Sequence, residues 1–542
     1  MDGGDQQKHK ASLVKTEVKR NVARQRGRAQ VCNGASTDVL SAGYTVISDL
    51  VDNSALPVAK PTVAGQRTGL AQERTNETVP HDQPSLLDTL PWSHQQQYRS
   101  DTLEQASASE WNFIMKYLDF VVPALFPFYQ PHIFDTGRSW ILLLLRKSKI
   151  AYHAALGLSC YYFTLTLSDA EKGREHAECK QLRWDDVERE TMLCFDSLRT
   201  DIMALNLDVG QTPGATLKRV GLFNSITQVI IFEMTLGKSA PWATHLPAAI
   251  TLFEEIMASP EAQSTYRGQR QSKFASVLLG IEDPMWTNPG PSNHIWSASQ
   301  TGFRFCAGML IFIDIIASTV LGETPRLLRY HNDVLSVSDD GLPAVGEAEI
   351  RLSSIVGCHN RVAELIADIS SLSSWKHTKS DMRHDQVSNQ SRSMDSRIRT
   401  RIQDLQQTFI TDLDSARLTV SNQIWGFAAE IYYILSVEGW HSTNPSIRAN
   451  VKQIIENLAN VPSDVLRTVT WPICIAGCFA DRNEETFFLA LFLKLSYAQS
   501  AGALCNVQGI VEGAWLRREE LSKSGLDWAS GFSLLGPQML LI

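Results

Sequence analysis

The amino-acid sequence predicts an all-α protein, in which a layered array of many helices follows a disordered N-terminal tail. Three observations lead to this prediction. From about residue 107 onward, apolar residues recur every three or four positions in one segment after another, which is the period of an amphipathic helix. No run of alternating apolar and polar residues indicates a sheet. The preceding residues carry no apolar period that lasts beyond one helical turn.

The composition is that of an ordinary globular protein. The 542 residues are 44% hydrophobic and 20% charged, and the formal net charge of −8 gives no reason to expect nucleic-acid binding from the charge of the whole chain. The nine cysteines are odd in number and widely spread, and the chain starts with polar and basic residues instead of a secretory leader. We therefore expect reduced thiols in the cytosol or the nucleus.

Residues 1–105 are expected to form a disordered polar and basic tail, because they bury too little apolar surface to offset the chain entropy lost on folding. Within the tail, the segment KRNVARQRGR holds a basic cluster. The cluster consists of Lys19, Arg20, Arg24, Arg26 and Arg28. It is a candidate nuclear-import signal or a weak, salt-sensitive phosphate contact, and the alternative is an ordinary solvated tail.

The helical region is expected to span residues 106–542. Ser107 precedes Glu110 by three positions, which is the spacing of a capping box at the start of a helix, and Pro123 should end or kink that helix. The remaining helices are expected at residues 138–146, 150–167, 169–207, 219–236, 244–258, 298–320, 348–372, 397–436, 446–458, 463–480, 484–499 and 506–521.

Two polar segments between these helices are expected to be loops. Residues 282–293 are rich in proline and glycine, and residues 376–394 are polar and expected to be mobile. Residues 150–168, in contrast, contain no charged side chain and approach the length of a membrane span. Because they include hydroxyl side chains and His153, and no second span matches them, we expect a buried helix and no membrane contact.

No motif in the sequence indicates catalysis: it lacks a phosphate-binding glycine loop and the G-x-S-x-G turn of a serine nucleophile. The segment WDDVERE offers carboxylates of the kind that hold magnesium in an isoprenoid cyclase. They are Asp185, Asp186, Glu188 and Glu190. Because Arg183 and Arg189 flank them on a charged helix, a solvated face with local ion pairs is favoured. The sequence thus predicts no catalytic residue, no metal ligand, no cofactor-binding residue and no cofactor.

Cys474 and Cys478 lie four residues apart in the stretch TWPICIAGC, so they share one face of a helix. Structural zinc requires four ligands, typically in two close pairs, and no second pair lies nearby in the sequence. The neighbours, which include Trp471, Ile473 and Phe479, are strongly apolar. We therefore expect both thiols to fill space in the core.

Five stretches of the sequence, taken together, carry a family resemblance. They are YLDFVVPALFPFYQP with GRSWILLLLRKSKIAYHAALGLSCYY (117–162), FRFCAGMLIFIDIIASTVLGETPRLL (303–328), IVGCHNRVAELIADISSLSSWK (355–376), IWGFAAEIYYILSVEG (424–439) and TVTWPICIAGCFAD (468–481). In this order they resemble the fungal-specific transcription factor domain, the regulatory region that follows zinc-cluster DNA readers in filamentous fungi. The resemblance spans most of residues 107–530.

The resemblance implies a nuclear transcription regulator, not an enzyme, that controls a metabolic or secondary-metabolite gene set through its helical body. Such regulators usually begin with six cysteines that hold two zinc ions, and a helix of that module reads the DNA major groove. Here Cys32 is the only cysteine before Cys160, and a cysteine-ligated module does not fold without its metal. Direct, specific DNA binding is therefore not supported, and the expected partner is the transcription machinery or a DNA-binding protein.

Several alternatives remain open at the level of sequence. The zinc module is missing because the gene model has lost an exon, because the protein acts through a partner, or because it is a degenerate copy. An all-α enzyme such as an isoprenoid cyclase and a non-transcriptional scaffold are the alternative functions. A homodimer is allowed but not indicated, since no heptad repeat joins the tail to the helical region.

Overall fold

The computed structural model describes most of the chain from residue 106 onward. The described residues are 103, 106–131, 137–170, 177–207, 215–237, 242–259, 272–282, 286–287, 294–337, 347–378, 384–411, 416–498, 504–536 and 539–542. The predicted tail lies outside these ranges apart from residue 103, and the basic cluster lies outside them entirely.

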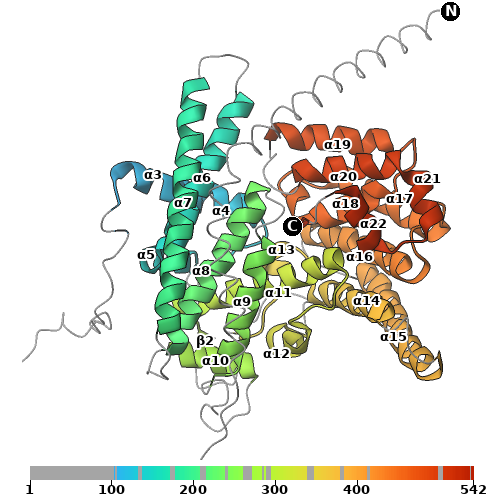
Figure 1. Ribbon diagram of the computed structural model, residues 1–542, viewed down its shortest axis with the longest axis horizontal. Coiled ribbons are helices and arrows are strands. Elements are labelled where there is room, and N and C mark those ends of the chain that lie inside the picture. The colour runs from blue at the N-terminus through green and yellow to red at the C-terminus, as the bar shows by residue number, and fades with distance from the viewer. Residues whose placement is uncertain are drawn as a thin grey trace, which may run out of the picture.

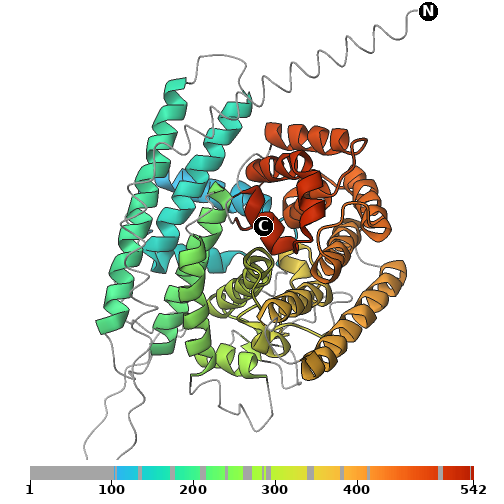
Figure 2. The same cartoon turned by 45° about the vertical axis from the view of Figure 1, so that its right-hand side comes forward.

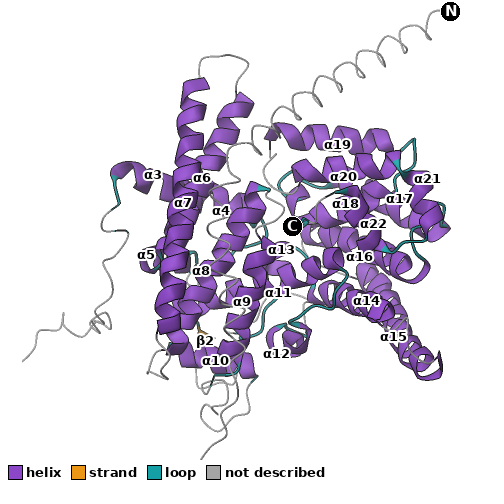
Figure 3. Ribbon diagram, in the orientation of Figure 1, coloured by secondary structure: helices purple, strands orange, loops and turns teal. Residues whose placement is uncertain are grey.

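Helices make up nearly all of the described secondary structure, which confirms the all-α prediction (Figure 3). An N-terminal group lies on the left in Figure 1 and a C-terminal group on the right, with α11 (Ala298–Leu321) between them. The first group comprises α3 (Ala108–Lys116), the π-helical turn η1 (Tyr117–Val121), α4 (Val122–Leu125), α5 (Ser139–Lys147), α6 (Lys149–Ala170), α7 (Ala177–Leu207), α8 (Ala215–Leu236), α9 (Trp242–Met257) and α10 (Lys273–Ile281).

The C-terminal group follows α11 in the chain. It comprises η6 (Leu328–Tyr330), α12 (His331–Val334), α13 (Ser353–Val356), α14 (Asn360–Thr378), α15 (His384–Thr411), α16 (Ala416–Glu438), α17 (Pro445–Asn460), η7 (Leu466–Val469), α18 (Thr470–Cys478), α19 (Glu485–Ala498), α20 (Leu504–Leu516), α21 (Arg518–Ser524) and α22 (Trp528–Leu535). Neighbouring layers pack in the order α7, α6, α8, α11, α14, α16 and α17, as predicted for a layered array.

Two residues of the segment predicted as a loop at residues 282–293 form a short strand, and residues 283–285 and 288–293 lie outside the described ranges. The strands β1 (Trp286–Thr287) and β2 (His294–Ile295) pair antiparallel, with Trp286 opposite Ile295. A single parallel bridge also joins Leu335 to Ile350. In the described part of the chain these are the only strand pairings, so they do not alter the fold class.

The first helix begins as the sequence predicts. The Ser107 amide donates to the Glu110 carboxylate at 2.6 Å, and the Ser107 hydroxyl accepts from the Glu110 amide at 3.3 Å. This capping box satisfies amide groups that have no partner within the helix. The helix then passes through the π-helical turn η1 into the short α4, where Pro123 occupies the first turn and the helix ends after Leu125.

Helix α11 is the centre of the molecule and is buried on all sides. It is long and apolar enough to cross a bilayer, but 89% of its apolar window is buried inside the protein. A capping box of Ser297 and Gln300 starts the helix, and Gly322 with φ of 68° ends it. Within it, burial raises the pKa of Asp314 to about 6, although the carboxylate accepts a hydrogen bond from the Leu327 amide at 2.8 Å.

The boundaries predicted between residues 348 and 436 are wrong in two places. The predicted helix 348–372 is interrupted at Gly357, whose φ of 72° ends α13 before α14 begins. The predicted helix 397–436 is two helices, α15 and α16, and the residues between them lie outside the described ranges.

The loop prediction for residues 376–394 also fails where the structure describes them. Residues 376–378 end α14 and residues 384–394 begin α15, while 379–383 lie outside the described residues. Helix α15 is polar, but its middle is tied to α14 by two arginines that share the carboxylate of Asp368. Arg397 and Arg401 bond it at 2.9 and 2.7 Å. Ion pairs between helices stabilise a helix without requiring apolar residues at helical spacing in its sequence.

Gly357 offers a test of this packing. A Cβ atom there would lie 2.1 Å from the ring of Phe128, so Gly357→Ala adds a steric overlap to the strain of a left-handed backbone. We expect the free energy of unfolding to fall by about 3 kcal/mol or more. Urea unfolding of the full chain, followed by tryptophan fluorescence, measures the change.

Gly525→Ala is the matched control, because Gly525 has a similar φ of 61° and nothing lies within 4 Å of the added Cβ. It should cost only the backbone strain, about 1–2 kcal/mol. Equal losses for the two variants would show that the Phe128 contact is not formed.

Candidate functional site at the α18–α19 junction

Helix α18 carries the stretch TWPICIAGC and is buried along its whole length. Pro472 lies in its first turn, where the missing amide hydrogen costs no helical hydrogen bond. The Trp471 ring stacks on Trp425 of α16, with ring centroids 5.5 Å apart and planes 11° apart. Its indole nitrogen donates to the hydroxyl of Thr319 in α11 at 3.0 Å. These contacts fix α18 against the central helix.

The two cysteines of α18 are free thiols in the core, as the sequence predicts. Cys474 is fully buried and Cys478 is 3% exposed. Burial raises the pKa of the Cys474 thiol, and the adjacent thiol of Cys478 raises it further. A metal ligand or a reactive nucleophile must be a thiolate, so this environment opposes both roles at neutral pH. Among the described residues, no group of three or more His, Cys, Asp or Glu side chains could hold a metal ion.

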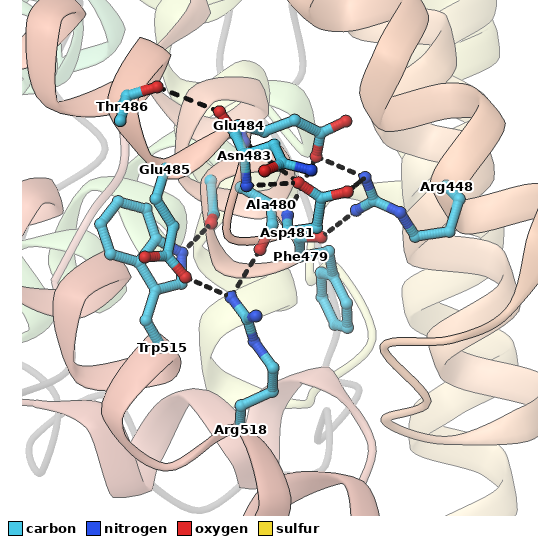
Figure 4. Close-up of polar contacts among 11 residues, drawn as sticks. Arg448, Phe479, Ala480, Asp481, Asn483, Glu484, Glu485, Thr486, Trp515 and Arg518 are labelled. Atoms are coloured by element: carbon cyan, nitrogen blue, oxygen red, sulfur yellow. Dashed lines mark hydrogen bonds and ion pairs between the residues drawn. The ribbon is translucent and has the colours of Figure 1, made fainter. Parts of the chain in front are cut away.

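The carboxyl end of α18 is held by side chains from other helices (Figure 4). The carbonyl groups at a helix end have no partner within the helix. Here Trp515 donates to the Gly477 carbonyl at 2.7 Å, Arg448 to the Phe479 carbonyl at 2.5 Å and Arg518 to the Ala480 carbonyl at 2.6 Å. The two cations also complement the negative end of the helix dipole.

Close packing at this end requires a glycine. A Cβ atom on Gly477 would lie 2.8 Å from a methyl group of Val511 in α20. The small residue therefore lets α20 approach the backbone of α18, which brings Trp515 within hydrogen-bonding distance of the carbonyl.

Acidic residues of the turn after α18 complete the arrangement. Asp481 accepts from the amides of Asn483 and Glu484 at 2.8 and 3.0 Å, and the Asp481 amide donates to the Glu484 carboxylate at 2.9 Å. Arg448 also contacts Asp481 at 3.3 Å and forms a close ion pair with Glu484. Arg518 pairs in the same way with Glu485 at 2.8 Å.

We call this set of contacts the α18–α19 junction. It comprises the carbonyl groups of Gly477, Phe479 and Ala480 and the side chains of Arg448, Asp481, Glu484, Glu485, Trp515 and Arg518. It joins helices α17 to α21 by charge-assisted hydrogen bonds, which fix geometry more strongly than neutral ones. Its polar groups are engaged with one another, so its chemistry is that of a structural junction between helices and not of catalysis.

Sequence reasoning missed this junction. Arg448 and Arg518 lie more than 30 positions along the chain from the carbonyl groups that they bind. Because every residue has a backbone carbonyl, the sequence does not show which of them accept hydrogen bonds from side chains. The one available signal is local: Asp481 precedes Glu484 by three positions, the spacing of a capping box, directly after the apolar run of α18.

Two of the four carboxylates of WDDVERE, those of Asp186 and Glu190, are engaged by nearby basic side chains in the structure. Asp186 forms ion pairs with Arg183 at 2.9 Å and Arg189 at 2.7 Å, as predicted for local pairing. Glu190 departs from the prediction of a solvated face, because it is only 5% exposed and bonds His153 of α6 at 2.8 Å. It points inward since α7 packs on α6 through that face.

A second buried pair lies close by in the N-terminal group. His245 of α9 bonds Glu233 of α8 at 2.7 Å, and the ring of Phe195 stacks on the imidazole with centroids 5.7 Å apart. Each partner sits alone in an apolar stretch of sequence, such as ITQVIIFEMTL around Glu233. A charged residue inside an apolar run is the signal that could have identified this pair.

Comparisons with known proteins converge on one family. A model of the fungal specific transcription factor domain matches residues 112–542. Transcription factor dibT of Pestalotiopsis microspora is 27% identical over the whole of this chain and 93% of its own length. Pestheic acid cluster transcriptional regulator 3 of Pestalotiopsis fici is 25% identical over 96% of this chain and 88% of its own length. Trichothecene biosynthesis transcription regulator TRI10 of Trichoderma arundinaceum is 23% identical over 81% of this chain and 99% of its own length. No solved structure matches.

The junction can be tested by replacing its central cation. Arg448→Met removes the hydrogen bonds to the Phe479 carbonyl and to two carboxylates, at a site where the arginine side chain is only 25% exposed. We expect the free energy of unfolding to fall by about 2–3 kcal/mol. Urea unfolding of the full chain measures this loss.

Lys452→Met provides the control on the same helix, α17. The Lys452 side chain is 72% exposed and its distance to Glu456 is 3.9 Å, so its loss should change stability by less than about 0.5 kcal/mol. Similar small effects for both variants would contradict a stabilising role of the junction.

Proposed function

The chain belongs to the family of the fungal specific transcription factor domain, and from this premise we propose that it regulates the transcription of a secondary-metabolite biosynthetic gene set. One observation carries the proposal. The family match covers residues 112–542, which is almost the entire described part of the chain, and relatives aligned over most of the chain are named as regulators of pestheic acid and trichothecene biosynthesis.

The properties of the described residues support a regulator more than an enzyme. The comparisons name transcription regulators, and two of the four carboxylates that a cyclase would use for magnesium are held by neighbours: Asp186 by two arginines and Glu190 by His153. The buried thiol of Cys194 also has its pKa raised by desolvation, which disfavours a nucleophilic thiolate. An isoprenoid cyclase therefore has less support than a regulatory body.

The sequence gives little support for direct binding of DNA by this chain. Within the 542 residues one cysteine precedes Cys160, so they do not supply the six ligands of a two-zinc DNA reader. We infer that the helical body acts through other proteins, either a DNA-binding partner or the transcription machinery. A purified full chain that binds promoter DNA tightly and with sequence specificity would overturn this inference.

Deleting the gene tests the regulatory function. We expect the transcripts of one group of biosynthetic genes to change severalfold, and to recover when the wild-type gene is restored. In parallel, the full chain fused to a foreign DNA-binding domain should alter the output of a matching reporter. A silent reporter together with unchanged transcripts would favour a scaffold without a role in transcription.

We also propose that the protein acts in the nucleus and that the basic cluster directs its import. The variant with Lys19, Arg20, Arg24, Arg26 and Arg28 replaced by alanine should lose most of its nuclear accumulation, because import receptors bind clustered positive charge. Fluorescence microscopy of a tagged full chain measures the distribution.

The control variant replaces Arg67, Arg74 and Arg99 by alanine, since these arginines are dispersed through the same region of the sequence. Its distribution should match that of the wild type. An unchanged distribution of the cluster variant would indicate an ordinary solvated tail.

A further inference from the structure

The outward face of α7 exposes apolar side chains to an unusual degree. This helix of 31 residues lies at the outer edge of the N-terminal group (Figure 1; Figure 2). Its opposite face packs on α6 and α8 through buried side chains that include Val187, Cys194 and Leu198. The exposed apolar residues are Leu182 (58%), Met192 (44%), Leu193 (39%) and Met203 (48%). They share one side of the helix at its middle and near both ends, and exposed apolar residues grouped on one face can mark an interaction surface.

Charged residues of both signs lie between these apolar positions. Asp185, Glu188, Arg189, Asp196 and Arg199 lie on the exposed side of the helix. Among the described residues, the side chains of Asp196 and Arg199 have no ion-pair partner, and the Arg189 side chain remains 60% exposed although it bonds Asp186. The face therefore presents the charges −, −, +, −, + in chain order, and Asp196 and Arg199 are available for further contacts.

Four of these charges are complementary to one another when the helix direction is reversed, and the fifth, Glu188, lies opposite the uncharged Ser197. In two antiparallel copies of α7 related by a two-fold axis between Met192 and Leu193, Arg189 lies opposite Asp196 of the second copy, because both are equally far from the axis. Asp185 and Arg199 come within one residue step of direct opposition, about 1.5 Å along the helix. Each of these ion pairs forms twice, as two-fold symmetry requires.

The apolar residues obey the same symmetry. Leu182 lies opposite Met203 of the second copy at each end of the contact, and Met192 lies opposite Leu193 of the second copy on either side of the axis. The contact would extend over about 30 Å of helix. The contact thus has apolar residues at its centre and at both ends. A charged pair lies between the centre and each end.

We propose that α7 is a dimerisation surface, on which the helix packs antiparallel against α7 of a second copy of this chain. A parallel pair in register would place Asp185, Arg189, Asp196 and Arg199 each beside its own counterpart, so every charged contact would be repulsive. Like charges placed together disfavour such an arrangement. The apolar contacts supply most of the affinity, since exposed ion pairs add little, and the charges select direction and register.

Charge reversal in the full chain tests the proposal. Wild-type protein should show a concentration-dependent monomer–dimer equilibrium in analytical ultracentrifugation. Asp196→Arg faces Arg189 of the second copy in both pairs, and Arg189→Asp faces Asp196. Each variant should therefore weaken dimerisation by about tenfold or more. Glu519→Arg on α21, where the side chain is 93% exposed, is the control and should dimerise like the wild type.

The decisive experiment mixes the two weakened variants. One chain with Asp196→Arg and one with Arg189→Asp form attractive pairs at both positions, so differently tagged copies should form a heterodimer with about wild-type affinity. Melting temperatures establish that each variant is folded. A wild-type chain that is monomeric at every concentration, a dimer that is insensitive to Asp196→Arg, or a mixture that fails to associate would each overturn the proposal.

Discussion

The exclusion of water from α11 is the constraint on which the rest of the structure depends. Nearly every side chain from Gln300 to Val320 is buried, and the helix contacts α5, α8 and α9 on one side and α13, α14 and α22 on the other. A helix that is apolar all round is stable in water only when other elements cover every face. The N-terminal and C-terminal groups supply these covers, so neither group is complete without the other.

Polar groups that are buried in such an apolar interior need hydrogen-bond partners. The α18–α19 junction supplies these partners at the end of α18. Helix α18 packs beside α11 and ends in the interior, where unpaired carbonyl groups would be costly. Arginines and a tryptophan from three neighbouring helices satisfy those carbonyls. The same bonds that allow α18 to be buried therefore also fix the positions of α17, α20 and α21.

The sequence predicted the features that depend on local pattern. The capping box of Ser107 and Glu110 and the burial of α18 follow from spacing and from unbroken apolar runs, which act within a few residues. The start of α15 was missed because residues 384–394 are polar and show no apolar period, and the printed contacts of this helix, such as those of Arg397 and Arg401 with Asp368, join positions about 30 residues apart. The junction and the pair of Glu190 with His153 were missed for the same reason: their partners meet only in the folded chain.

The contrast between the buried ionisable side chains and the exposed surface limits how this protein can recognise a partner. Burial raises the pKa of Cys194, Cys306 and Cys474, and the buried pair of His245 and Glu233 is enclosed by apolar helices. These buried thiols are therefore held in the uncharged form and do not reach solvent. A regulator built in this way can distinguish its partners only by its surface. Charged residues of both signs between exposed apolar residues, as on α7, provide that distinction, because their order favours one arrangement of one partner and opposes the others.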